Sequence, residues 1–159
     1  MIEQMEVDGL GFRRRTSPPK FIVLHHTNTR SAADTRKVLS MRGLSTHYEV
    51  DEEGRCYEYL CPEHLVSFHA GAFNGRSIGV DATHLHKVPW PEVQVDACHR
   101  LVCHLLRRFD LPLSVAPTDA RFKTPEEVVS AGYTVIRHSN VKATLCPDGL
   151  PMPGEGVPA

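Results

Sequence analysis

The chain has 159 residues, 18 of them basic and 19 acidic, and a formal net charge of -1. This length suits one domain with a single core, and we expect no second domain. A charge so close to zero excludes the broad basic field of a nucleic-acid-binding protein. The five cysteines are an odd number without regular spacing, so we expect reduced thiols and no disulfide framework.

The sequence contains neither of the segments that direct a chain into or across a membrane. The N-terminus does not join a basic region to an apolar stretch, as a secretory signal does. No stretch approaches the roughly 18 apolar residues that span a bilayer. We therefore expect a protein without a signal peptide that is cytoplasmic at synthesis, does not insert into membranes and is a monomer.

The first third of the chain predicts an arm, a strand and a helix. Residues 1–19 are expected to form an N-terminal arm that ends in three solvated arginines, Arg13 to Arg15. Residues 20–24 are apolar on both faces and predict a buried strand that ends at a pair of histidines. Residues 31–43 begin with a serine suited to an N-cap and end with basic residues and glycine, which is typical of a helix.

The middle of the chain predicts a hairpin and a further strand. Residues 46–50 and 55–60 are rich in Tyr and Val, and the acidic residues and Gly54 between them favour a turn with positive φ. Residues 77–83 predict another short strand, in which Gly79 allows a close approach to the backbone.

Two helices, a strand and a tail are predicted in the last part. Apolar residues recur at helical spacing through residues 92–109. Thr124, Pro125 and Glu127 form a capping pattern that starts a short helix. Residues 133–137 predict a strand, and residues 149–159 a loose C-terminal tail. The order of these elements predicts an α/β fold. We expect one domain, residues 20–148, with a central mixed β-sheet flanked by helices.

A histidine and a cysteine stand eight residues apart in a polar segment, at His138 and Cys146. Imidazole and thiolate are side chains that zinc prefers, and the pair His25 and His26 at a strand end is the expected source of a third ligand. Three protein ligands leave one tetrahedral position for water, whereas a structural zinc takes four. On the residues alone, a histidine after a strand is more often a hydrogen-bonded structural residue.

Five segments follow one another in the order and with the spacing found in the zinc-dependent N-acetylmuramoyl-L-alanine amidases. They are FIVLHHT at 21–27, STHYEV at 45–50, FHAG at 68–71, NGRSIGV at 74–80, and residues 138–147. The chain thus resembles a family that includes phage lysozyme-type amidases and peptidoglycan recognition proteins. The resemblance implies one Zn²⁺ per chain, in a surface groove beside the sheet, held by His25, His138 and Cys146. It also implies cleavage of the amide between N-acetylmuramic acid and the L-alanine of the stem peptide.

The same resemblance implies roles for further residues. Asp81 follows SIGV, where similar bacterial amidases have a catalytic Glu, and is expected to transfer the proton of the attacking water. Thr144 matches a position that can donate a hydrogen bond to the developing oxyanion. Thr46 stands where phage-type enzymes have a Tyr, which makes Asp81 more important. Contacts to substrate are expected from His26, His47, His69, Asn74 and Thr46, although His47 could equally be a packed strand residue.

Two other classes of protein stay open. A non-catalytic peptidoglycan-binding module of the same fold would lack the cysteine ligand, so Cys146 favours the enzyme. A protein with a structural zinc would need a fourth ligand. His84 and His86 alternate along a predicted strand and suit a second metal pair, but no third partner is evident. The enzyme could be a phage endolysin, a secreted effector or a recycling enzyme, and would reach a cell wall by lysis or through a secretion system.

Overall fold

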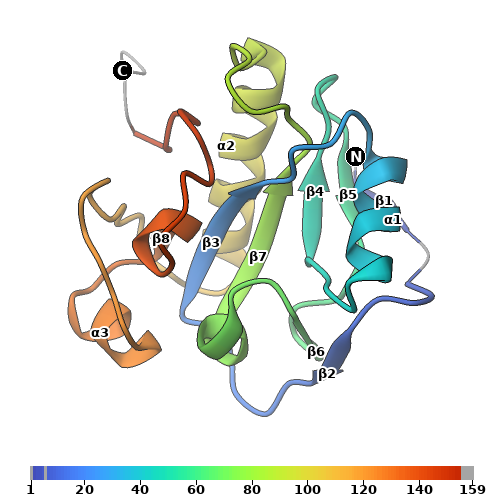
Figure 1. Ribbon diagram of the computed structural model, residues 1–159. Helices are drawn as coiled ribbons and strands as arrows, with labels where there is room; N and C mark the ends of the chain where they lie inside the picture. Colours follow the sequence, from blue (N-terminus) through green and yellow to red (C-terminus); the bar gives the residue numbers. More distant parts are fainter. Residues whose placement is uncertain (1, 6, 155–159) are drawn as a thin grey trace.

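The computed structural model describes residues 2–5 and 7–154 (Figure 1). Its six-stranded sheet has the order β1-β5-β4-β7-β3-β8, and a two-stranded sheet pairs β2 with β6. All neighbours in the larger sheet run parallel except β4 and β5, so the predicted mixed sheet is confirmed. The strands are β1 Ile2–Gln4, β2 Phe12–Arg14, β3 Phe21–His26, β4 Tyr48–Val50, β5 Cys56–Glu58, β6 Leu65–Ser67, β7 Ser77–Ala82 and β8 Val135–Arg137.

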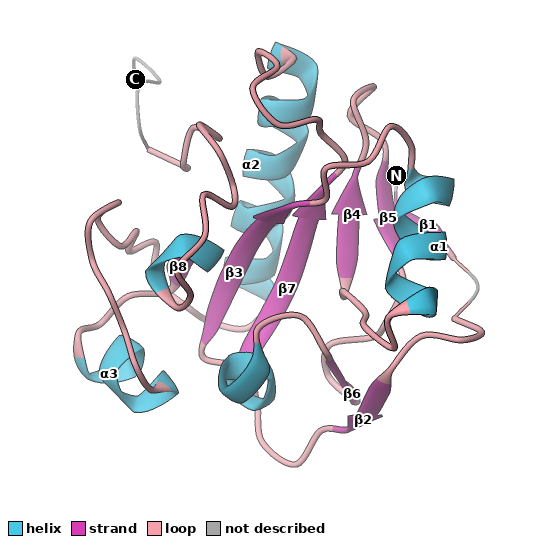
Figure 2. Cartoon of the chain, in the orientation of Figure 1, coloured by secondary structure: helices cyan, strands magenta, loops and turns pink. Residues whose placement is uncertain are grey.

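Helices cover the sheet, as predicted for this fold class (Figure 2). The α-helices are α1 Ala32–Met41, α2 Glu92–Arg108 and α3 Pro125–Ser130, and two 3₁₀ helices are η1 Gly71–Arg76 and η2 His138–Asn140. The predicted caps are present, because the side chains of Ser31 and Thr124 accept hydrogen bonds from the N–H groups of Asp34 and Glu127. Within the described residues, none of these helices combines the length and apolar character needed to cross a membrane.

The two faces of β3 belong to two different cores. Ile22 and Leu24 pack with the apolar side of α2 in the main core, whereas Phe21 and Val23 pack with α3 and η1 on the other face. Side chains alternate between the faces of a strand, so the next residue of the second set, His25, lies on the face away from α2. The functional site is built on that face.

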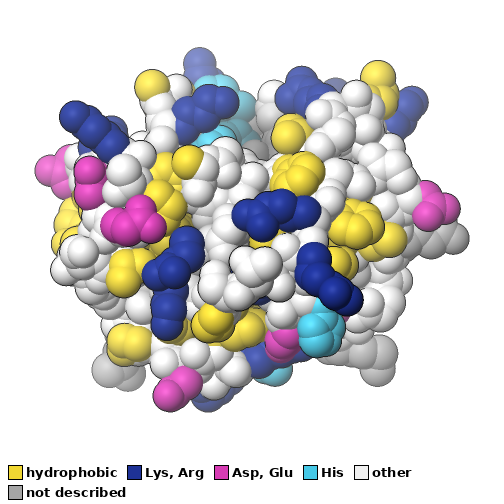
Figure 3. All heavy atoms as spheres, turned by 90° about the horizontal axis from the view of Figure 1, so that it is seen from below, with side chains coloured by type: hydrophobic (Ala, Val, Ile, Leu, Met, Phe, Trp, Pro, Cys, Tyr) yellow, Lys and Arg dark blue, Asp and Glu magenta, His cyan; other side chains and the backbone are white. Residues whose placement is uncertain are grey.

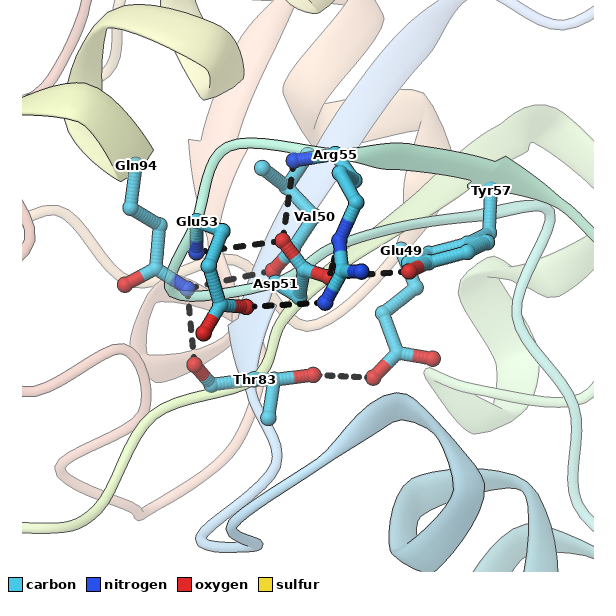
Figure 4. Close-up of polar contacts among 8 residues, drawn as sticks. All are labelled: Glu49, Val50, Asp51, Glu53, Arg55, Tyr57, Thr83 and Gln94. Carbon is cyan, nitrogen blue, oxygen red and sulfur yellow. Dashed lines mark hydrogen bonds and ion pairs between the residues drawn. The ribbon is translucent and has the colours of Figure 1, made fainter. Parts of the chain in front are cut away.

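The predicted hairpin of β4 and β5 is confirmed, and its turn is held by one carboxylate (Figure 4). The Asp51 carboxylate accepts hydrogen bonds from the N–H of Arg55 at 2.8 Å, from Arg55 Nε at 2.7 Å and from the Tyr57 hydroxyl at 2.8 Å. Gly54 has a φ of +77°, as the turn requires. On the same side, Gln94 of α2 donates to the carbonyl oxygens of Val50 and Thr83, which fixes the helix against the sheet.

The expected N-terminal arm is structured, and the solvation expected for its arginines is wrong for Arg15. Residues 2–4 form an edge strand beside β5, and residues 12–14 pair with β6. The Arg15 guanidinium is buried and donates to the carbonyl oxygens of Leu65, Gly75 and Ser77. These carbonyl groups come from segments that are far from Arg15 in the sequence, so no local sequence pattern could predict that they would surround its guanidinium. The predicted bounds of the domain, 20–148, stay a prediction.

The expected loose C-terminal tail is also wrong for its first residues. Leu150 and Met152 are buried in the main core against α2, and the carbonyl oxygen of Pro151 accepts a hydrogen bond from His99 at 2.9 Å. Two apolar side chains among prolines and glycines have no periodicity, so nothing in the sequence distinguished this segment from a solvated one. Residues 155–159 of the predicted tail lie outside the described residues.

We predict that Met152→Ala lowers the free energy of unfolding by about 2–5 kcal/mol, because it removes a buried side chain and leaves a cavity. The matched control is Met41→Ala, since Met41 is 78% exposed and Met152 is 0% exposed. The control should change the free energy by no more than about 0.5 kcal/mol. Urea denaturation measures both, and equal small effects would contradict the packing of the C-terminal segment.

Candidate functional site

A cleft opens at the carboxyl ends of β3 and β7, the two parallel strands at the centre of the sheet. Its polar lining comes from these two strands, from the segment that follows β8, from α1 and the loops around it, and from the loop after β6, and it includes Arg42 and His69. Residues of α1 and the loop after β6 supply an apolar wall. The residues that line the cleft include His25, Leu39, Phe68, Asp81, His138 and Cys146.

The three predicted metal ligands come together in this cleft. The donor atoms of His25, His138 and Cys146 all lie within 4.8 Å of one another. His25 is on β3, and His138 follows the neighbouring strand β8 directly. Cys146 is brought back by two backbone contacts: its carbonyl accepts from Ser139 N–H at 2.8 Å, and its Sγ accepts from His26 N–H at 3.1 Å.

The environment of these three groups suits a divalent metal. Burial holds the pKa of His25 well below its ordinary value, and burial together with Lys142 lowers the pKa of His138 to about 4. Both imidazoles are therefore neutral at neutral pH, which is the state that binds metal. Burial, to which Asp81 adds, raises the pKa of the Cys146 thiol to about 12. A metal must therefore displace the thiol proton when it binds, and two imidazoles with one thiolate are a donor set that fits zinc.

Asp81 lies on the wall of the cleft, in register between two other polar residues. It pairs with His25 across β3 and with Glu49 across β4, so all three side chains stand on one face. Burial, and next the nearby Glu49 carboxylate, hold the pKa of Asp81 well above its ordinary value, while a hydrogen bond with the Thr46 hydroxyl opposes the shift. A carboxyl group in this setting is a stronger base than an exposed one.

Glu49 is a polar residue of the site that sequence reasoning missed. It is completely buried and accepts hydrogen bonds from the hydroxyl groups of Tyr59 and Thr83. Figure 4 shows its carboxylate directed at Thr83, away from the carboxylate of Asp51. Its position two residues after His47, in the short strand β4, was the one sign in the sequence that its side chain shares a face with that histidine. A glutamate in a hairpin is usually solvated, so this sign was not decisive.

Two residues expected to contact substrate are buried in the protein. Thr46 and His47 are both 0% exposed. Gly79 N–H donates to His47 Nδ1 at 2.9 Å, so Nε2 carries the proton and donates to the carbonyl oxygen of Leu65 at 3.1 Å. The Thr46 hydroxyl donates to the carbonyl oxygen of Tyr48. The geometry therefore does not support the predicted contacts to substrate for this pair. His47 is a packed residue, as in the alternative interpretation, but it lies directly before β4 and not within the strand.

His26 and His69 do line the cleft. His26 is half-buried, and its ring stacks on His86 with the centroids 6.1 Å apart. His69 Nδ1 lies 2.9 Å from His25 Nε2, a contact that the sequence did not predict. Their proposed contacts to substrate stay predictions.

Asn74 and Thr144 make contacts within the protein. Asn74 Oδ1 accepts hydrogen bonds from the N–H groups of His69 and Ala70 at 3.1 and 2.6 Å. The Thr144 hydroxyl accepts a hydrogen bond from Cys146 N–H at 3.3 Å. Thr144 lines a separate hollow, together with Ser139 and Leu145, and does not line the cleft. The predicted hydrogen bond from Thr144 to the oxyanion thus has no direct geometric support and stays a prediction. The predicted contact between Asn74 and substrate also stays a prediction.

The second metal pair considered for His84 and His86 is not formed. Both residues follow the end of β7 and do not share a strand face. His84 is buried and stacks on Trp90 with centroids 3.8 Å apart, whereas His86 Nδ1 contacts the Asp148 carboxylate at 2.9 Å. Each ring has its own partner, so we assign no metal to them.

Fold and cleft together define an α/β domain in which two histidines and a cysteine that could hold a metal ion lie beside a buried carboxyl group. The model of the N-acetylmuramoyl-L-alanine amidase family matches residues 15–149. The chain therefore belongs to the N-acetylmuramoyl-L-alanine amidase family, as its five sequence segments predicted. The activity of this family is the hydrolysis of peptidoglycan at the amide after N-acetylmuramic acid.

Solved structures with the same fold come from bacteria and from an animal. The N-acetylmuramoyl-L-alanine amidase LysC from Clostridium intestinale URNW is 20% identical, with a TM-score of 0.64 over 94% of this chain and 90% of that one. The hydrolase AmiA from Staphylococcus aureus is 21% identical, with a TM-score of 0.69 over 91% and 68%. Drosophila PGRP-LB is 17% identical, with a TM-score of 0.57 over 94% and 90%. Identities this low show a shared fold alone. No curated protein sequence matches the chain.

We predict that His47→Gln flattens the dependence of stability on pH. Burial lowers the pKa of His47 to about 3 in the folded protein, whereas an unfolded histidine titrates near ~6.5. Between these values the unfolded state binds more protons, so the free energy of unfolding falls as pH falls, by about 1.4 kcal/mol per pH unit for one histidine. The variant should lose this contribution to the slope.

Urea denaturation at several pH values between ~7 and ~4 measures that slope. A loss of stability that is the same at every pH would report only the missing hydrogen bonds of His47. The matched control is the same change at His104, which is exposed on α2. If His47→Gln and the native protein keep the same slope, His47 is protonated in the folded state and its burial has been misjudged.

Proposed function

We propose that the protein is a zinc-dependent N-acetylmuramoyl-L-alanine amidase, with one zinc per chain. The observation that carries the proposal is the convergence of His25, His138 and Cys146 with the buried carboxyl of Asp81 in one cleft. When bound there, zinc would polarise the scissile carbonyl and make water a better nucleophile. Membership of the amidase family supports the reaction, and the donor set supports the metal.

In this proposal Asp81 holds and moves the proton. It accepts a proton from the attacking water and passes it to the departing amine of L-alanine, so that the leaving group departs neutral. Its raised pKa suits both steps, because a group that both takes and gives a proton works best when its pKa is near the operating pH.

The cleft walls would hold the substrate and exclude water. Leu39 and Phe68 supply apolar surface beside the metal ligands. A second hollow shares Phe68, His69 and His138 with the cleft and continues towards Lys142. A substrate with a sugar on one side of the amide and a peptide on the other therefore has a continuous surface to occupy.

Binding without catalysis is the competing function. A module of that kind needs neither a thiolate ligand nor a buried proton acceptor in its groove. Cys146 and Asp81 both line the cleft of this protein, and this favours the enzyme.

We predict that the native chain binds one zinc and loses activity on chelation, and that Cys146→Ala reduces both zinc content and turnover. The reason is that two neutral imidazoles alone leave the metal with half of a tetrahedral ligand set. Cys103→Ala is the matched control, because Cys103 lies on α2 outside the cleft. Metal analysis after dialysis, with a turnover assay, decides the point, and full zinc content in Cys146→Ala would refute the assignment.

We predict that Asp81→Asn keeps zinc content and fold but lowers turnover by about 10²–10⁴-fold, the usual contribution of a positioned acid or base. Asp96→Asn, on the exposed side of α2, should leave turnover unchanged. Products are identified by mass spectrometry on intact sacculi and on isolated muropeptides. Near-normal turnover of zinc-loaded Asp81→Asn would remove this residue from the mechanism. Preference for sacculi would indicate an endolysin or effector, and preference for muropeptides a recycling enzyme.

A further inference from the structure

Two polar side chains, those of Ser77 and His69, connect the backbone of η1 to the metal ligand His25. The Ser77 hydroxyl donates to the carbonyl oxygen of Phe73 at 2.9 Å, and its oxygen lies 3.0 Å from His69 Nε2. A hydroxyl group has one proton, which is already given to Phe73. The Ser77 oxygen must therefore accept a hydrogen bond from His69, so the proton of the His69 ring is on Nε2.

The tautomer of His69 determines the tautomer of His25. A neutral imidazole has one N–H, so with Nε2 protonated the Nδ1 atom of His69 is an acceptor. His25 Nε2 lies 2.9 Å from that atom and must donate to it. The proton of the His25 ring is then on Nε2, and the lone pair that remains for a metal is on Nδ1.

The His69 ring is fixed in place by the backbone around it. A Cβ atom on Gly79 would lie 2.8, 2.9 and 3.0 Å from three ring atoms of His69, so the ring lies directly on a strand residue that has no side chain. Asn74 Oδ1 accepts from the N–H of His69 and of Ala70 and fixes the backbone that carries the ring. Gly79 was expected to allow a close approach, and the approaching group is this imidazole.

His69 is not itself a ligand of the cluster. Among the described residues, the group of donor atoms within 4.8 Å of one another consists of His25, His138 and Cys146, without His69. Its position behind His25 is that of a partner which orients a ligand, because metal-binding histidines usually donate their second ring N–H to such a group.

We infer that Ser77 and His69 are positioning residues that hold His25 in the tautomer with Nε2 protonated and so direct its Nδ1 atom to the metal. This inference deepens the proposed function, because it rests on the metal site of that proposal. It also gives a physical reason for two of the sequence segments, FHAG and NGRSIGV. They contain the imidazole of His69, the amide of Asn74 that holds its backbone, the hydroxyl of Ser77 that accepts its hydrogen bond and the glycine, Gly79, on which the ring lies.

The tautomer can be observed directly, in the metal-free and in the zinc-loaded full-length protein. Long-range ¹H–¹⁵N NMR spectra of protein labelled with ¹⁵N-histidine separate protonated from bare ring nitrogens, and a His25→Gln spectrum assigns the His25 signals. We expect His25 Nε2 to be protonated in both states and Nδ1 to shift on zinc binding. A protonated Nδ1 in the metal-free protein, or zinc bound through Nε2, would overturn the inference.

Zinc affinity, measured by competition with a chelating dye, supplies a second readout. Ser77→Ala should weaken zinc binding by roughly 10–100-fold, the usual effect of losing a partner behind a metal ligand, and Ser77→Thr, which keeps a hydroxyl, should restore it. The matched control is Ser67→Ala. Ser67 is also a buried β-strand serine with a histidine partner, but its hydroxyl contacts His47, outside this chain of hydrogen bonds.

The outcomes separate this inference from the proposed function. If the native protein binds no zinc, the proposed function fails, and the metal-free spectrum still tests the tautomer. If the native protein binds zinc but Ser77→Ala and Ser67→Ala bind it equally well, the inference fails and the proposed function stands. Gly79→Ala should weaken zinc binding as Ser77→Ala does, because its methyl group displaces the His69 ring; native affinity in this variant would also count against the inference.

Discussion

The register of three parallel strands determines what the cleft contains. His25 of β3, Asp81 of β7 and Glu49 of β4 lie in one row across the sheet, because each is the registered partner of the next. Side chains alternate along a strand, so a slip of one residue in β7 would turn Asp81 into the core against α2 and bring Val80 to the cleft. Leu24 and Val80, the apolar residues that directly precede His25 and Asp81 in their strands, pack in the main core and thereby prevent such a slip.

Burying a row of polar side chains such as His25, Asp81 and Glu49 costs free energy unless each side chain has a hydrogen-bond partner. Glu49 has two hydroxyl donors, and the His69 ring has His25 on one nitrogen and Ser77 on the other. Burial holds the pKa values of His25 and His69 low, so that both imidazoles are neutral, and holds the pKa of Asp81 high, so that its carboxyl is hard to ionise. The conditions that stabilise the row are those that a metal-assisted hydrolysis needs, since neutral imidazoles bind metal and a carboxyl with a raised pKa exchanges protons.

Periodicity and caps predicted most of the fold, and side-chain chemistry together with the family resemblance singled out the three residues, His25, His138 and Cys146, that meet in the cleft. The β-strand at residues 21–26, the two capped helices and the hairpin are where the alternation of apolar residues and the turn residues indicate them. Arg15 and Met152 were missed because their burial depends on segments far away in the chain, and nothing local marks it. The sequence left open whether His47 contacts substrate or is packed, for a related reason. The local sequence around a histidine at a strand does not show whether other segments cover its side chain.

The contacts of the Cys146 loop bear on how the metal site is assembled. Cys146 Sγ accepts from His26 N–H, and the N–H of Asp148 donates to His26 Nδ1. From the other side, Trp90 Nε1 donates to the carbonyl oxygen of Asp148 at 2.8 Å, and His86 contacts the carboxylate of the same residue. These contacts between protein groups close a loop of about 120 residues between β3 and Cys146, so the entropy of closing that loop is lost as the chain folds. A zinc ion bound as proposed would therefore meet side chains that the protein itself has gathered, unlike the ion of a zinc finger, which has to organise the chain around itself.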